Sequence, residues 1–112
     1  MLFAGWGKHD SALMFTINAA AAAYGVTEAI HAEWAISRPD FVSQSEVAAR
    51  ETAPKAWRFE GEMHEIAATF EAAGLPPEFH RGAAEVYRRL ARFKDDASSA
   101  DLDEIVAALL GR

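Results

Sequence analysis

The chain has 112 residues, of which 51% are hydrophobic and 25% are charged, so it can fold as one globular domain, residues 1–112. Its formal net charge of −6 argues against a nucleic-acid scaffold, because phosphate binding needs a basic surface. The absence of cysteine excludes a disulfide framework and a cysteine-ligated metal site, and it fits a cytoplasmic protein.

The sequence pattern predicts an all-α fold, a single compact multi-helix domain. Alanine is abundant, β-branched residues are few, and no segment alternates apolar and polar residues with a period of two. We expect helices over residues 2–24, 27–37, 40–51, 54–73, 77–94 and 99–110. Gly25 and Gly74 follow two of these segments and are typical helix stops.

The first expected helix is apolar on nearly every side, because large side chains recur around its whole circumference. These side chains are Leu2, Phe3, Trp6, Leu13, Met14, Phe15, Ile17 and Tyr24. A domain of this size cannot cover such a helix completely, so part of it should lie exposed in a monomer. We therefore expect a symmetric homodimer, in which the same patch is buried twice.

The same segment predicts neither a membrane span nor a secretion signal. Its uninterrupted apolar run is too short to cross a bilayer. The alanine run Ala19–Ala23 resembles a signal-peptide cleavage region, but the charged stretch Lys8–Asp10 and the amide of Asn18 interrupt the pattern. The sequence therefore predicts no membrane partner.

Three polar side chains, Lys8, Ser11 and Asn18, line one face of the first helix around Phe15. Such groups are costly in a buried helix unless they have partners. We predict a substrate-facing stripe, in which Lys8 binds a carboxylate or a hydroxyl group. The alternative is that Lys8 lies near the frayed end of the helix and reaches water through its flexible stem.

The segment after Pro54 carries a second set of candidate binding residues. Lys55 and Arg58 lie near the expected start of a helix, where they could hold an anion together with free backbone N–H groups. The alternative is that Arg58 pairs with Glu62 inside the helix.

Trp57 and Gly61 lie one helical turn apart in the same segment. A bulky ring beside a glycine predicts a second packed surface, where the backbone lies close to another helix. Enlarging Gly61 should then overpack that contact.

The fifth expected helix carries an apolar seam made of Phe79, Ala83, Val86, Leu90 and Phe93. His80 lies beside that seam and faces Tyr87, an arrangement that could bind a ligand or relay a proton. The alternative is a semi-buried histidine whose hydrogen bonds are satisfied within the fold.

Two absences bear on cofactors. Glu28 and His31 match half of a di-iron helix motif, but the sequence has no second Glu-x-x-His pair, so we predict no metal site. No strand followed by a Gly-rich turn and a helix is present, so we predict no NAD or NADP site within this chain.

The segments Thr52–Met63, Gly74–Pro76 and Phe79–His80 carry a resemblance to a known family. They resemble the C-terminal helical domain of phosphogluconate-dehydrogenase-like proteins, which belong to the β-hydroxyacid dehydrogenase superfamily. The similarity begins at Met1 and extends through Leu90, about four-fifths of the chain.

The resemblance implies a 6-phosphogluconate dehydrogenase C-terminal type of fold and an N-terminal Rossmann domain, absent from this chain, that binds NAD or NADP. It implies that the present domain completes the pocket for a small anionic hydroxyacid-type substrate and forms a homodimer. The superfamily's active-site lysine would fall just before Met1. Lys8 matches another lysine of the pattern, one usually followed by glycine, and here His9 stands in that place.

These inferences together predict a substrate-binding and dimerisation domain that is catalytically incomplete alone. The alternative is a free-standing helical homodimer without enzymatic activity. The candidate substrate-binding residues are Lys8, Ser11, Asn18, Lys55, Arg58 and His80, and Lys8 is the candidate catalytic residue.

Overall fold

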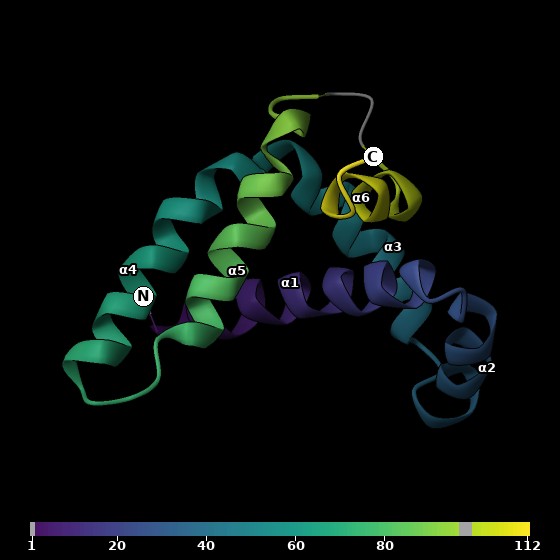
Figure 1. Ribbon diagram of the computed structural model, residues 1–112, viewed down its shortest axis with the longest axis horizontal. Helices are drawn as coiled ribbons and strands as arrows, with labels where there is room; N and C mark the ends of the chain where they lie inside the picture. Colours follow the sequence, from purple (N-terminus) through teal and green to yellow (C-terminus); the bar gives the residue numbers. More distant parts are fainter. Residues whose placement is uncertain (1, 97–99) are drawn as a thin grey trace.

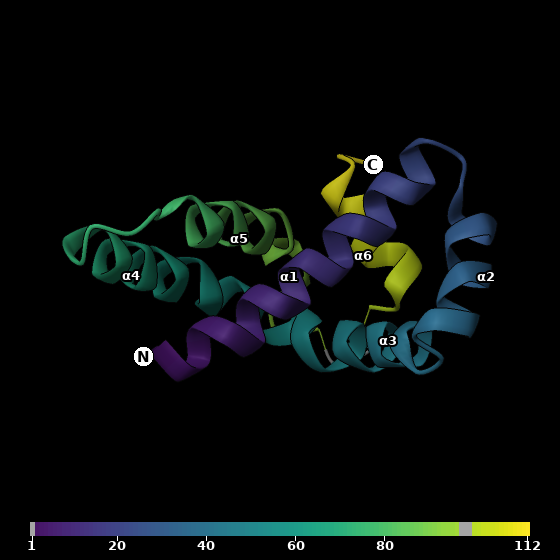
Figure 2. The same cartoon turned by 90° about the horizontal axis from the view of Figure 1, so that it is seen from below.

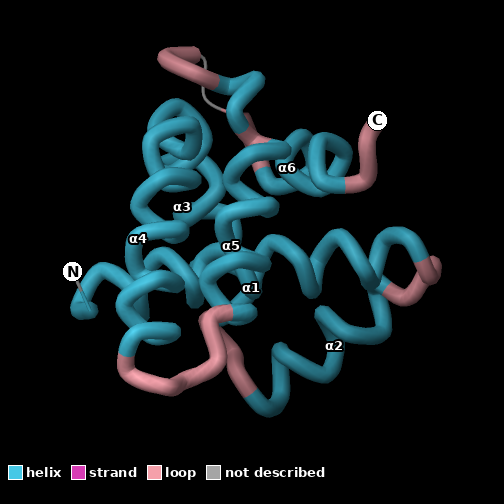
Figure 3. Tube along the Cα trace, turned by 60° about the vertical axis from the view of Figure 1, so that its left-hand side comes forward, coloured by secondary structure: helices cyan, strands magenta, loops and turns pink. Residues whose placement is uncertain are grey.

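Every regular element is a helix in the computed structural model, which describes residues 2–96 and 100–112 (Figures 1 and 3). The part of the chain so described contains no strand, and the predicted all-α fold is confirmed. The elements are α1 (Leu2–Ala23), α2 (Thr27–Ser37), α3 (Phe41–Thr52), the 3₁₀ segment η1 (Ala53–Arg58), α4 (Phe59–Ala72), α5 (Glu78–Arg89), the 3₁₀ turn η2 (Ala91–Phe93) and α6 (Leu102–Leu109).

The long helix α1 is the central element, and Figure 2 shows it crossing the molecule. It contacts α2, α3, α4, α5 and α6. Ala12, Phe15 and Ala19 recur at helical spacing and are buried beneath these neighbours. The helix stops where Gly25 takes φ = 70° and Val26 N–H donates to Ala21 O at 2.9 Å, so the predicted stop is confirmed.

Helices α4 and α5 form a hairpin that packs against α1 (Figure 1). The turn forms because Gly74 takes φ = 79° and Leu75 N–H donates to Phe70 O at 2.9 Å. Met63 and Ile66 of α4 and Tyr87 of α5 are fully buried in the hairpin. The hairpin therefore supplies much of the core against which the N-terminal half of α1 lies.

The predicted seam is confirmed at Ala83, Leu90 and Phe93, which are buried. It is wrong at Phe79, which is 60% exposed, and α5 also buries His80 and Tyr87. The difference arises because the polar atoms of His80 and Tyr87 find acceptors on the backbone of α1, which removes most of the cost of burying these rings. The hydropathy of the sequence alone does not reveal these acceptors on α1.

The helix predicted over residues 54–73 is divided into two elements. Pro54 has no N–H to continue the α3 ladder, and the chain continues as η1 before α4 starts at Phe59. The carbonyl oxygen of Pro54 accepts a hydrogen bond from Asp95 N–H at 3.1 Å, which ties η1 to the end of η2.

The expected close packing at Gly61 is wrong for this chain. Gly61 is exposed, and a Cβ atom added to it would meet nothing within 4 Å. Trp57 is 38% exposed and lies under the ammonium group of Lys94, which is 4.3 Å from the centre of the ring. The core face of α4 instead consists of Met63, Ile66 and Ala67.

The helix predicted over residues 27–37 is confirmed as α2, with Val26 at its N-cap position, whereas the start of the last predicted helix shifts. The last helix was expected to begin near Ser99, which lies outside the described residues. Helix α6 begins at Leu102, and the carboxylate of Asp101 caps it by accepting from Glu104 N–H at 2.9 Å.

Candidate functional site

The N-terminal half of α1 lies directly against the α4–α5 hairpin, and Gly5 is the point of closest approach. His80 Nε2 donates to Gly5 O at 3.0 Å. A Cβ atom at Gly5 would lie 3.2 Å from His80 Nε2 and 3.3 Å from Ile66 Cγ2. A side chain at residue 5 would therefore force His80 or Ile66 to move by a few tenths of an ångström from its place in the hairpin.

Lys8 is held at the same junction by three contacts. Its Nζ atom donates to both carboxylate oxygens of Glu62, at 2.6 and 2.7 Å, and lies 4.4 Å from the centre of the Phe59 ring. Its backbone carbonyl accepts a hydrogen bond from Tyr87 Oη at 2.5 Å. Only 29% of the Lys8 side chain is exposed, so its charge is half-buried and already neutralised by a carboxylate.

Tyr87 is a neutral hydrogen-bond donor at this junction. Burial raises the pKa of its phenol well above the ordinary value, and the nearby negative charges of Glu62 and Asp10 raise it further. The hydroxyl group therefore stays protonated at every ordinary pH and donates a hydrogen bond to the Lys8 carbonyl oxygen.

His80 is buried and forms the floor of the contact between α1 and the hairpin. Because Gly5 O can only accept, Nε2 is the donor of this hydrogen bond, and the buried Nδ1 atom has no hydrogen-bond partner among the described residues. The ring lies 4.8 Å from Phe70 and 5.2 Å from His9, measured between ring centres. This arrangement agrees with the predicted alternative at Nε2, which is satisfied within the fold, and departs from it at Nδ1.

His9 closes the outer side of this cluster. Partial burial lowers the pKa of its imidazole, the neighbouring His80 lowers it further, and Asp10 opposes both effects. Its ring also packs edge-on against Phe79, with 5.9 Å between the ring centres.

Asn18 lies far from Lys8 although both belong to the same predicted stripe. Ten residues of helix correspond to about 15 Å at 1.5 Å per residue, which is too far for one small substrate. Asn18 is buried, its Nδ2 donates to Met14 O at 2.9 Å, and its Oδ1 accepts from His31 Nε2 at 3.0 Å. Ser11 lies between the two and is half-buried.

Lys55 and Arg58 lie on η1 and are both exposed. Neither forms a salt bridge with any residue in the described ranges. The alternative pairing of Arg58 with Glu62 does not form, because Glu62 binds Lys8 instead. These two side chains are therefore cations whose charge is available to a ligand.

The structure thus divides the predicted site residues into three groups. Lys8 and His80 meet at the junction of α1 with the hairpin, through Gly5 and Tyr87. Lys55 and Arg58 stand exposed on η1, while Asn18 belongs to the contact between α1 and α2.

Sequence reasoning missed two residues of the junction, Glu62 and Gly5. Glu62 was considered only as a partner of Arg58 within its own helix, and its true partner, Lys8, is 54 residues away in the chain. Gly5 gave no signal, because a glycine early in an apolar helix has no distinguishing neighbour in sequence.

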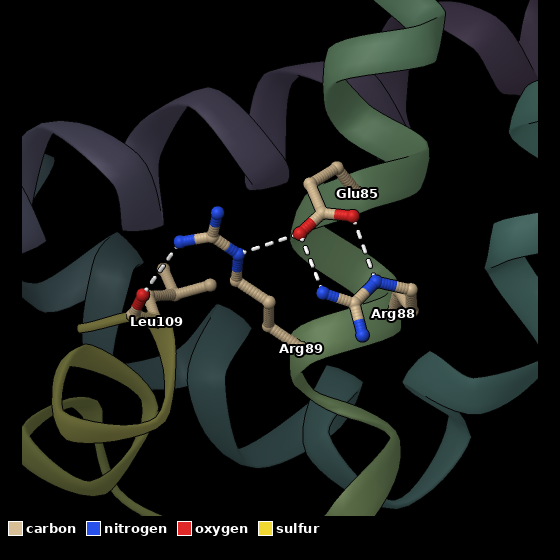
Figure 4. Close-up of polar contacts among 4 residues, drawn as sticks. All are labelled: Glu85, Arg88, Arg89 and Leu109. Atoms are coloured by element: carbon tan, nitrogen blue, oxygen red, sulfur yellow. Dashed lines mark hydrogen bonds and ion pairs between the residues drawn. The ribbon is translucent and has the colours of Figure 1, made fainter. Parts of the chain in front are cut away.

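A second polar cluster lies on the outer surface of α5 (Figure 4). Glu85 accepts hydrogen bonds from both Arg88 and Arg89, and these bonds lower the pKa of its carboxyl group to about 2. Arg89 also donates from Nη1 to Leu109 O at 2.9 Å, which ties α5 to the end of α6. These arginines have internal partners, so we assign them to holding the helices together.

Residues 2–96 and 100–112 lack two features that bear on ligands and membranes. No group of three or more histidine, aspartate or glutamate side chains is placed to hold a metal ion there. Within the same residues, no helix has both the length and the apolar character that a bilayer crossing requires.

Comparison with known proteins gives one match. A family model described as a domain of unknown function, DUF1932, matches residues 21–90, from the C-terminal end of α1 to the end of α5. No curated protein and no solved structure matches the chain. The matched residues include η1, the α4–α5 hairpin and His31, which is hydrogen-bonded to Asn18. The N-terminal part of α1 lies outside the match.

Proposed function

Since the chain belongs to the DUF1932 family, a domain known from NAD(P)-binding dehydrogenase-like proteins, we propose that it is a substrate-binding and dimerisation domain of such an enzyme. The enzyme is an NAD(P)-dependent, phosphogluconate or β-hydroxyacid dehydrogenase-like oxidoreductase of the cytoplasm. A Rossmann domain outside these 112 residues holds the cofactor, so the present domain is inactive alone.

The observation that carries the proposal is the exposed face of α1. We define this exposed α1 face as Leu2, Phe3, Trp6 and Leu13, which are 61%, 96%, 77% and 48% exposed. The opposite side of the same helix is fixed to the hairpin through Gly5 and Lys8. A helix that is rigidly held on one side and apolar on the other is suited to bind another protein surface.

The size of this face supports a second copy as its partner. Phe79 of α5 adjoins the face through His9 and is itself 60% exposed. At about 150–250 Å² for each aromatic side chain, Phe3, Trp6 and Phe79 together expose roughly 350–580 Å². Leu2 and Leu13 add to that area, and a specific interface takes about 800 Å² from each partner.

The substrate half of the proposal rests on the free cations of η1. Lys55 and Arg58 have no carboxylate partner in the described ranges, and an exposed guanidinium group binds carboxylates through two parallel hydrogen bonds. We therefore assign a small anionic hydroxyacid-type substrate to this side of the domain. Because the ammonium group of Lys8 already forms an ion pair with Glu62, we assign Lys8 the role of a positioning residue.

Steady-state kinetics of the full-length enzyme test this assignment. With a panel of small hydroxyacids and the absorbance of the reduced nicotinamide as readout, Arg58→Ala should raise KM roughly tenfold to hundredfold, the usual effect of losing one charged contact. The matched control is Arg50→Ala, which removes another exposed and unpaired arginine, on α3. Equal kinetics for the two variants would contradict a substrate role for Arg58.

One observation favours the second candidate function, a homodimeric interaction module without enzymatic activity. Lys8 and Asn18, the polar groups expected to face a substrate, both use their hydrogen-bonding capacity within the fold. In that case a full-length protein would dimerise but would oxidise no hydroxyacid in the panel, with NAD or with NADP.

A further inference from the structure

A small pocket is lined by residues of α1, α2 and α3. Figure 2 shows α2 and α3 on the opposite side of the molecule from the α4–α5 hairpin, with α1 crossing between them. The pocket has a volume of about 160 Å³. Its walls include Asp10 and Met14 of α1, Trp34 of α2, and Arg38 and Phe41 from the start of α3 and the turn before it. The pocket is separate from the exposed cations of η1.

The two charged residues of this pocket have opposite signs and do not pair. Neither Asp10 nor Arg38 forms a salt bridge with any residue in the described ranges. Opposite charges that line one small pocket without meeting leave their attraction available to a ligand that carries both signs.

The Arg38 guanidinium group lies at the end of a series of ring contacts. It lies over Phe41, 5.0 Å from the ring centre, and Phe41 packs against Trp34 with 4.3 Å between the ring centres. Trp34 in turn stacks on His31 at 5.6 Å, and His31 is anchored by its hydrogen bond to the buried Asn18. An arginine positioned in this way loses little further freedom when it binds a carboxylate.

We propose that this pocket binds a small zwitterion of the α-amino acid class, with its carboxylate on Arg38 and its ammonium group on Asp10. The apolar side chain of the ligand packs against Trp34 and Met14, which supply the apolar wall. A pocket of this volume suits a ligand with a short aliphatic side chain. The assignment uses neither Lys55 nor Arg58 and shares one lining residue, Leu13, with the exposed α1 face.

Heteronuclear NMR of the 112-residue chain tests the assignment with L-valine as the probe. The indole N–H resonance of Trp34 should shift with saturation, at concentrations up to about ten times a millimolar dissociation constant. The assignment of that resonance among the three tryptophans comes from Trp34→Phe. Two fragments of the probe serve as comparisons: 3-methylbutanoate lacks the ammonium group, and 2-methylpropan-1-amine lacks the carboxylate. Both should bind at least tenfold more weakly than valine.

Two variants test the charged contacts. Arg38→Gln and Asp10→Asn should each weaken valine binding at least tenfold, whereas Arg50→Gln, at an exposed and unpaired arginine outside the pocket, should leave it unchanged. All three positions are exposed, and circular dichroism verifies that each variant folds. The proposal is overturned if valine shifts no Trp34 resonance, if 3-methylbutanoate binds as well as valine, or if Arg50→Gln weakens binding as much as Arg38→Gln.

Discussion

Replacing Gly5 by alanine probes the contact that fixes α1 to the hairpin. At an exposed position inside a helix, glycine to alanine stabilises by about 0.8–1.0 kcal/mol, because alanine has the higher helix propensity. At Gly5 the new methyl group would lie 3.2 Å from His80 Nε2 and 3.3 Å from Ile66 Cγ2, and both neighbours belong to the packed hairpin. Overpacking of this kind costs about 1–3 kcal/mol, and it also strains the hydrogen bond between His80 and Gly5.

The matched controls are Gly7→Ala in the same helix and Gly61→Ala in α4, where an added Cβ atom meets nothing within 4 Å. We expect Gly7→Ala to be stabilised and Gly5→Ala to have a free energy of unfolding lower than that of Gly7→Ala by about 1–3 kcal/mol. Urea unfolding at one protein concentration measures the difference. Equal free energies for Gly5→Ala and Gly7→Ala would refute the close approach of α1 to His80.

Three further predictions concern polar groups. Glu62→Gln should lower the free energy of unfolding by about 0.5–1 kcal/mol, since the ion pair with Lys8 is part-exposed, while Glu65→Gln, at an exposed glutamate, should change nothing; equal losses in urea unfolding would contradict the pairing. The pKa of His9 is lowered in the folded state, so its contribution to stability is fully present above the unfolded value of 6.5 and is lost as the pH falls through the lowered value. Urea unfolding from neutral to acidic pH should show this loss, and His9→Gln should reduce it; an unchanged pH profile would refute the role of His9. Asn18→Leu should lower the free energy of unfolding by about 1–3 kcal/mol, because Met14 O and His31 Nε2 lose their hydrogen bonds to the buried amide. A thermal melt equal to that of the native chain would contradict the anchoring of α2.

The parts of the fold that could be predicted depend on local chemistry. The stop of α1 at Gly25 and the turn at Gly74 follow from the left-handed backbone that glycine adopts there. These features need only a few neighbouring residues, so a single sequence carries them.

The parts that could not be predicted depend on partners far away in the chain. In the sequence, His80 and Tyr87 look like polar interruptions of an apolar seam. They become core residues because Gly5 O and Lys8 O, which lie 75 and 79 residues away in the chain, accept hydrogen bonds from them. Lys8 was expected to face a substrate, and its attachment to Glu62 depends on how α1 crosses α4. Hydropathy and helical periodicity describe one helix at a time and contain neither contact.

The mass of the chain in solution tests the central claim most directly, that a second copy covers the exposed α1 face. Light scattering coupled to size-exclusion chromatography at micromolar concentration should give about twice the 12.2 kDa chain mass. Trp6→Lys, on the exposed α1 face, should return the mass to that of one chain, whereas Ile36→Lys, at an 81% exposed apolar residue on α2, should leave the dimer intact. A soluble native chain that stays at 12.2 kDa would contradict the claim.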